Sequence, residues 1–160
     1  MKYAVVTSKT TGNTGLLAET VKKVIPEEDL IYWGLPDDRA LEADMILVGF
    51  WTNMGTCDAA AGEFLGRIEG KEVFLFGSAG WAGSDYFREI LMKSSACLGK
   101  GCTVAGTFMC QGRMPLSVRE RYQKLPPEKG EAMIKNFDQA LTHPDERDLE
   151  RLENTVKALI

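Results

Sequence analysis

The stretch Thr7–Thr14 reads Thr-Ser-Lys-Thr-Thr-Gly-Asn-Thr and follows an apolar segment, Lys2–Val6, which predicts a short buried strand. Apolar residues then recur at helical spacing from Leu16 to Ile25, which predicts a helix that begins near Gly12. Hydroxyls, backbone N–H groups and the unpaired donors of a first helical turn can converge on one phosphate at such a junction. We therefore interpret the stretch as a phosphate-binding loop, with an ordinary capped turn as the alternative.

Hydrogen-bond donors are expected to supply the phosphate affinity of this loop. Each hydrogen bond to a charged acceptor contributes about 1.5–3 kcal/mol, whereas the helix dipole adds only about 0.3–1 kcal/mol at an exposed helix end. Several converging donors outweigh the dipole, so the loop needs no Arg.

Length and composition suit a single domain over residues 1–160, because 44% of the residues are hydrophobic. The formal net charge of −4 argues against nonspecific nucleic-acid binding and favours basic protein partners. No segment approaches the ~20 apolar residues of a membrane span, and no signal-peptide pattern is present, so we expect a cytoplasmic protein with no membrane contact. The four cysteines form no C-x-x-C pair and His143 is far from them, so free thiols and no metal site are expected.

Apolar runs along the chain predict an α/β protein with five strands. The strands are expected at Lys2–Val6, Leu30–Trp33, Met45–Phe50, Glu72–Gly77 and Cys102–Cys110. Met45–Phe50 is a continuous apolar run, which is typical of a central strand covered on both faces. The later helices are expected at Tyr86–Leu98, Leu116–Lys124 and Glu128–Leu141, with a last one that has Pro144 in its first turn. Helices between strands predict an open parallel sheet with helices on both faces.

Such sheets bind ligands at the carboxyl ends of their strands. Three segments are expected to leave that edge as loops, namely Thr7–Thr14, Trp51–Asp58 and Ser78–Asp85. The second and third loops each hold a Trp among Gly and small polar residues. A phosphate loop beside two loops with flat side chains indicates a site for a phosphorylated planar ring system.

These features resemble the flavodoxin family. The resemblance lies in Thr11-Gly12-Asn13-Thr14 after the first strand, in the two Gly/Trp loops and in the order of the segments, and it covers most of the chain up to Cys110. It implies a flavodoxin-like three-layer sandwich with a five-stranded parallel sheet in the order 2-1-3-4-5. It also implies FMN as the cofactor, with its phosphate on the first loop and its isoalloxazine ring between the other two.

The resemblance also implies which residues contact FMN. They are Ser8, Lys9, Thr10, Thr11, Gly12, Asn13, Thr14, Trp51, Thr52, Asn53, Met54, Gly55, Ser78, Ala79, Gly80 and Trp81. Ser8 is a helper in phosphate binding, and the family usually has a hydroxyl where Lys9 stands, which leaves the role of Lys9 open. The Gly55 peptide is the candidate to meet flavin N5. The residue that stacks on the ring is left open among Trp51, Met54, Trp81 and Tyr86.

The remaining polar residues receive structural interpretations, and no catalytic residue is assigned. Asp58 and Asp85 are expected to cap helices, and His143 is expected to be a surface residue. Gln111–Met114 is interpreted as an ordinary turn, with a contact to the cofactor edge or to a partner as the alternative.

An FMN-binding electron carrier between redox proteins, a reductase donor and an acceptor enzyme, is the function that this resemblance implies. Its acidic surface would steer a basic partner and would lower the potential of the bound flavin. The alternative is an FMN-dependent NAD(P)H:quinone or flavin reductase on the same fold. The sequence lacks a Walker loop and a Gly-x-Gly-x-x-Gly fingerprint, which disfavours other nucleotide-binding classes.

Overall fold

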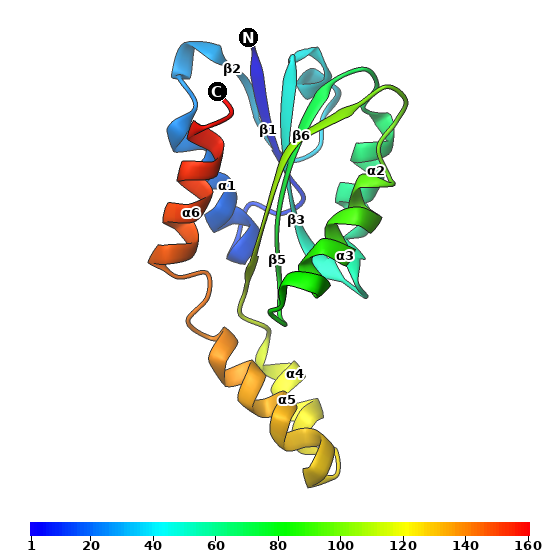
Figure 1. The fold of residues 1–160 in the computed structure, drawn as a ribbon, viewed down its shortest axis with the longest axis vertical. Coiled ribbons are helices and arrows are strands. Elements are labelled where there is room, and N and C mark those ends of the chain that lie inside the picture. The colour runs from blue at the N-terminus through cyan, green and yellow to red at the C-terminus, as the bar shows by residue number, and fades with distance from the viewer.

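A computed structural model describes residues 1–160 as a central sheet with helices on both faces (Figure 1). The strands are β1 (Tyr3–Thr7), β2 (Leu30–Gly34), β3 (Met45–Asn53), β4 (Thr56–Cys57), β5 (Glu72–Ala79) and β6 (Thr103–Gln111). The α-helices are α1 (Gly12–Val24), α2 (Ala59–Arg67), α3 (Ser84–Ser95), α4 (Leu116–Gln123), α5 (Pro127–Ala140) and α6 (Glu146–Lys157). Two 3-10 turns, η1 (Glu27–Asp29) and η2 (Asp38–Glu42), flank β2. None of the helices combines the length and hydropathy that crossing a bilayer requires.

The sheet has the strand order β2-β1-β3-β5-β6, and all four pairings along this path are parallel. The short β4 lies off this path and pairs antiparallel with β3. The predicted order 2-1-3-4-5 is therefore confirmed, because β5 and β6 are the fourth and fifth strands of the parallel sheet. Helices α1 and α6 cover one face, and α2 and α3 cover the other (Figure 1).

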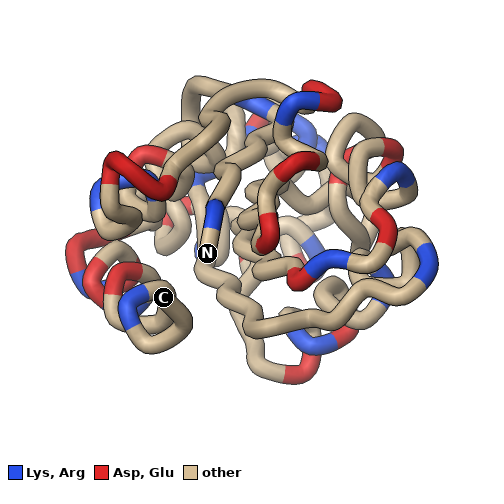
Figure 2. The backbone as a smooth tube through the Cα atoms, turned by 90° about the horizontal axis from the view of Figure 1, so that it is seen from above, with Lys and Arg blue, Asp and Glu red and all other residues tan.

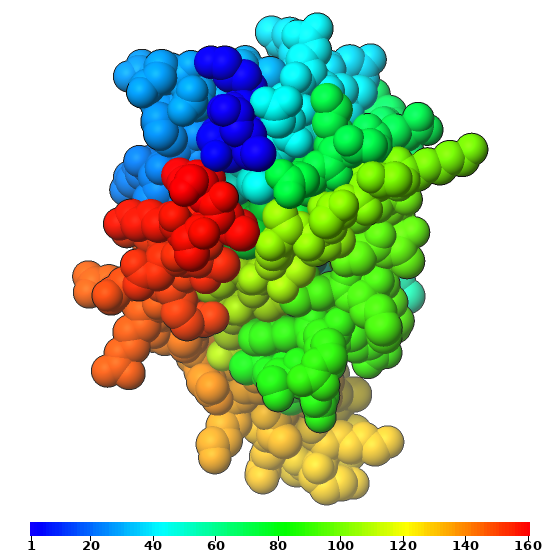
Figure 3. All heavy atoms as spheres, turned by 45° about the horizontal axis from the view of Figure 1, so that its top comes forward, coloured from blue at the N-terminus to red at the C-terminus, as the bar shows by residue number.

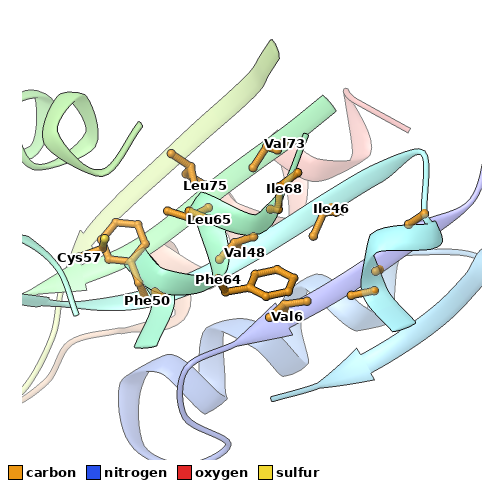
Figure 4. Packing of buried hydrophobic residues seen from close by; sticks show 14 of the residues in the cluster. Val6, Ile46, Val48, Phe50, Cys57, Phe64, Leu65, Ile68, Val73 and Leu75 are labelled. Atoms are coloured by element: carbon orange, nitrogen blue, oxygen red, sulfur yellow. The ribbon is translucent and has the colours of Figure 1, made fainter. Parts of the chain in front are cut away.

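The core has two parts, one on each face of the sheet. Figure 4 shows the part under α2, where Phe64 lies beside Val6 of β1 and Val48 of β3, and Phe50 of β3 lies beside Cys57. The part on the other face of the sheet includes Leu17 of α1 and Leu152 of α6. Consecutive residues of β3 are buried from Met45 to Phe50, as expected for a strand covered on both faces.

The chain after β6 differs from the strand–helix alternation before it. Helices α4 and α5 pack on each other and project beyond the carboxyl end of the sheet (Figures 1 and 3). A bidentate pair holds them together, because the Arg119 guanidinium donates to both carboxylate oxygens of Asp138 at 3.0 and 3.2 Å. The same contact holds the pKa of the Asp138 carboxyl below its usual value. The two helices therefore form one unit, the α4–α5 hairpin.

Several expected boundaries differ from the structure. The segment Trp51–Asp58 is a β-hairpin rather than a loop, because β3 continues to Asn53 and pairs back with β4. Pro144 lies before α6, whose N-cap is Asp145. His143 is half-buried, and its Nδ1 lies 2.7 Å from an Asp148 carboxylate oxygen that also accepts the Asp145 N–H in the capping box.

The two predicted helix caps have different outcomes. Asp58 is the N-cap of α2, where its carboxylate accepts the Ala61 N–H. The N-cap of α3 is Gly83, so the prediction that Asp85 caps this helix is wrong. The Asp85 carboxylate instead accepts a hydrogen bond from Arg88.

Two glycines in neighbouring strands make room for two aromatic rings. Phe50 of β3 lies beside Gly77 of β5, and Gly49 of β3 lies beside Phe76 of β5. A Cβ on Gly77 would be 2.5 Å from the Phe50 ring, and a Cβ on Gly49 would be 2.5 Å from the Phe76 ring. Both rings are fully buried. The centre of the sheet therefore has no space for a side chain at either glycine.

The substitution Gly77→Ala is expected to destabilise the protein by about 1–3 kcal/mol, because the added methyl forces the Phe50 ring out of a close-packed core. Gly66→Ala, on the exposed face of α2, is the control and should gain up to about 1 kcal/mol from its higher helix propensity. Urea unfolding measures both free energies. A Gly77→Ala variant as stable as the parent would contradict this packing.

Candidate functional site

Two adjoining hollows lie where the carboxyl ends of β1, β3 and β5 meet the α4–α5 hairpin. The loop hollow, of about 560 Å³, is lined by Lys9, Gly12, Asn13, Thr14, Trp51, Arg113, Met114 and Pro115. The ring hollow, of about 450 Å³, is lined by Asn13, Trp51, Thr52, Asn53, Met54, Gly55, Ser78, Ala79, Gly80, Trp81, Tyr86, Gly112, Arg113, Met114, Pro115, Val118, Arg121 and Tyr122. Because they share Asn13, Trp51 and the segment 113–115, the two hollows form one elongated site.

The first loop presents open space and polar donors at the start of α1. Gly12 adopts a left-handed φ of +65°, and no atom lies within 4 Å of the position that its Cβ would take. Thr11 is the N-cap, but its side chain makes no capping hydrogen bond, so the first-turn N–H groups lack a side-chain partner there. Thr14 is 2% exposed and lines the loop hollow. This donor set is suited to an oxyanion such as a phosphate.

Two other residues of the first loop make contacts inside the protein. The Ser8 hydroxyl donates to Asp58 at 2.9 Å, and the same carboxylate oxygen accepts the Trp51 N–H at 3.1 Å. The Lys9 ammonium lies 4.9 Å from the centre of the Trp51 ring, at cation–π distance. Ser8 and Lys9 thus connect the first loop to the β3–β4 hairpin. Of the other predicted phosphate contacts, Thr10 and Thr11 are exposed and outside the lining of both hollows.

The β3–β4 hairpin forms one wall of the ring hollow. Its two-residue turn, Met54-Gly55, has φ values of 53° and 83°, as in a type I′ turn. Met54 is the only non-glycine residue with a positive φ, and it is 95% exposed. A left-handed conformation costs a side chain about 1–2 kcal/mol, and Met54 recovers none of this through burial. A strained, exposed apolar residue at the edge of a hollow is a candidate ligand contact.

Two amides hold the third loop in place. The Gly80 carbonyl accepts hydrogen bonds from Gln111 Nε2 and Asn136 Nδ2, both at 3.0 Å, and Gln111 Nε2 is also 3.1 Å from Asn136 Oδ1. Gln111 is buried at the end of β6, and Asn136 is in α5. The Thr52 hydroxyl joins this loop to the β3–β4 hairpin by donating to the Ser78 carbonyl at 2.8 Å.

The segment after β6 forms a wall that sequence reasoning interpreted as an ordinary turn. Asn13 Nδ2 donates to the Arg113 carbonyl at 2.9 Å, and the Arg113 N–H donates to the His143 carbonyl at 2.9 Å. The segment therefore crosses from β6 to the first loop. The Met114 side chain packs directly on Gly80, where a Cβ would overlap its sulfur.

Helix α4 gives the ring hollow a further wall. Val118, Arg121 and Tyr122 line the ring hollow at i, i+3 and i+4 spacing, which places them on one face of the helix. In the sequence, this spacing shows that the three residues share one face of a helix. It does not show which part of the protein that face lines. Neither hollow is lined by Asp, Glu, His or Cys. The site suits the binding of an anionic group beside a flat ring, and it offers no carboxylate or imidazole for proton transfer.

Comparisons with known proteins identify the family of this chain. The family model described as "Flavodoxin domain" matches residues 4–157. The chain is 34% identical to the "Flavodoxin-like domain-containing protein BilS" of Clostridium symbiosum (strain WAL-14163), over 93% of this chain and 90% of that protein. The protein of the same name from Clostridioides difficile (strain CD3) is 28% identical, with the same coverage of both chains.

Solved structures show the same fold at lower identity. Oxidised flavodoxin 2 from Bacillus cereus has a TM-score of 0.58 at 20% identity and covers 99% of this chain and 97% of its own. A flavodoxin from the domain Archaea has a TM-score of 0.57 at 19% identity, over 99% and 96% of the two chains. The structural matches support the fold, and the match of the family model along nearly the whole sequence shows that this chain belongs to the flavodoxin domain family.

Proposed function

We propose that this protein binds FMN across the two hollows and transfers electrons between redox proteins. The observation that carries the proposal is the continuity of a donor-rich hollow at a helix N-terminus with a second hollow that has aromatic walls. FMN has a phosphate and a flat ring, joined by a short polyol, and the flavodoxin family typically binds it. The flavin supplies the redox chemistry, and the protein supplies binding and electrostatics.

The residues present fit the phosphate of FMN. Gly12 leaves open space at the turn, and the first-turn N–H groups of α1 together with Thr14 offer donors there. In the proposed role, Asn13 donates to the Arg113 carbonyl and thereby sets the distance between the first loop and the opposite wall. Ser8 and Lys9 have a supporting role, because both contact the base of the β3–β4 hairpin.

The ring hollow fits an isoalloxazine in size and lining. Its volume of about 450 Å³ lies within the ~300–1,000 Å³ range of small-molecule sites. Trp51, Trp81 and Tyr86 offer flat surfaces, and Met54 and Gly55 form the turn beside them. We assign the third loop to one edge of the ring, because hydrogen bonds from the Gln111 and Asn136 side-chain amides to the Gly80 carbonyl fix its position.

A reductase that uses NAD(P)H and a quinone or free flavin is the second candidate. The observation in its favour is the α4–α5 hairpin, whose Val118, Arg121 and Tyr122 give the ring hollow an additional wall for a small molecule. Anaerobic assays of the FMN-loaded protein separate the two functions. A carrier passes electrons from photoreduced flavin to a protein acceptor and leaves NAD(P)H unoxidised, whereas a reductase oxidises NAD(P)H rapidly when a quinone is added.

Replacement of Thr14 by Val is expected to weaken FMN binding about tenfold or more while riboflavin binding changes little. The variant removes one hydrogen bond to the FMN phosphate, and a hydrogen bond to a charged group contributes about 1.5–3 kcal/mol. Riboflavin has no phosphate, so its binding does not depend on this hydrogen bond. Quenching of flavin fluorescence measures both affinities. Thr155→Val in α6, outside both hollows, is the matched control. Equal losses for the two ligands would refute the phosphate assignment of Thr14.

Replacement of Asn136 by Ala tests the third loop separately. The variant removes one of the two amide donors to the Gly80 carbonyl, and a hydrogen bond of this kind contributes about 0.5–1.5 kcal/mol. FMN and riboflavin should both bind about two- to tenfold more weakly, with an unchanged ratio between them, because the ring is common to both. Asn154→Ala in α6 is the control. Unchanged affinities for both ligands would show that the hydrogen bond from Asn136 to the Gly80 carbonyl does not support ring binding.

A further inference from the structure

The charge around the two hollows is opposite in sign to the charge of the whole protein. The chain carries a formal net charge of −4. The lining of the hollows nevertheless includes Lys9, Arg113 and Arg121 and no Asp or Glu. At the other end of the molecule, where both termini lie, acidic and basic residues are interspersed (Figure 2). The negative excess is therefore carried by residues outside the lining of the two hollows.

These three cations, which we call the cationic rim, are free of ion pairs. None of the salt bridges in the structure includes Lys9, Arg113 or Arg121. All three residues are exposed. On α4 the neighbouring Arg119 is paired with Asp138, while Glu120 is two residues from both Val118 and Tyr122 and so points away from the helix face that lines the hollow. The rim thus presents positive charge at the open site. Arg121 lines the ring hollow but not the loop hollow, so it stays unpaired when a phosphate occupies the loop hollow beside Lys9 and Arg113.

Large apolar side chains are exposed around the same hollows. Met54 is 95% exposed at the tip of the β3–β4 hairpin, Leu116 is 69% exposed at the start of α4, and Trp81 is 38% exposed in the third loop. Single exposed apolar residues are ordinary, but several of them around one site indicate an interaction surface. Trp, Met and Arg are also residue types that are enriched in protein interfaces.

We propose that the cationic rim and these apolar side chains form a docking surface for a redox protein with an acidic contact face. The inference rests on the proposed function, because an electron carrier must bring its partner to the open side of the flavin site. It differs from the expectation of a basic partner, which follows from net charge alone. At physiological ionic strength the screening length is about 8 Å, so the charges at the contact determine the complementarity more than distant ones do.

A pair of acceptors with opposite charge tests this surface. Cytochrome c is a basic haem protein, and its succinylated form is acidic with the same haem. The full-length protein, loaded with FMN and photoreduced, is mixed with each acceptor in a stopped-flow instrument at low and at physiological ionic strength. The succinylated form is expected to be reduced faster at low salt and to slow as salt rises. The rate with native cytochrome c should rise with salt, because screening removes its repulsion from the rim.

Charge variants locate the effect on the rim. Arg121→Gln should slow reduction of the succinylated acceptor at low salt by about two- to fivefold, as expected for loss of one exposed ion pair, and should flatten its salt dependence. Arg147→Gln removes the same charge from α6, outside both hollows, and should change neither. Kd values for FMN and riboflavin are measured for each variant alongside the rates.

The outcomes separate this inference from the proposed function. Faster reduction of native cytochrome c that slows with salt would overturn the acidic-partner surface while electron transfer itself stands. Lower FMN affinity in Arg121→Gln, with an unchanged salt dependence of the rates, would also overturn it, because that arginine would then serve the cofactor. Failure of the reduced protein to reduce either haem would instead refute the proposed electron carrier.

Discussion

The parallel alignment of β1, β3 and β5 is the constraint on which the rest of the structure depends. Strands that run in one direction bring their carboxyl ends to one edge, so segments distant in sequence must leave the sheet side by side. The first loop, the β3–β4 hairpin and the third loop meet there for this reason. Hydrogen bonds between them, such as Thr52 to the Ser78 carbonyl and Ser8 to Asp58, hold the spacing of the site.

The fold could be predicted from local patterns because each strand has its own apolar signal. The run Met45–Phe50 identified the central strand, and the helices between strands indicated a parallel sheet. The order of the strands came from the family resemblance. The end of β3 was missed, because the β3–β4 hairpin turns at Met54-Gly55 rather than at the Asn-Gly that usually marks a type I′ turn. Pro144 was placed in α6 because Pro suits a first helical turn, but the Asp145–Asp148 capping box starts the helix later.

The candidate site was only partly visible in the sequence. Most of the residues predicted for the three loops line the two hollows, whereas Ser8, Thr10 and Thr11 do not. The wall formed by Arg113, Met114 and α4 depends on contacts such as Asn13 to the Arg113 carbonyl, which joins residues 100 positions apart. No local pattern reports such a contact. Net charge gave no signal of the cationic rim, because a sum over the chain averages the charges of all its surfaces.

The central claim is that these segments jointly form a binding site for FMN. Titration of FMN with the apoprotein, followed by flavin fluorescence and visible absorption, tests it most directly. The account predicts a one-to-one complex at micromolar protein, with altered fluorescence and a shifted flavin spectrum as the ring leaves water for aromatic walls. Flavin fluorescence and absorption that stay unchanged throughout the titration would contradict the account, even though the fold would stand.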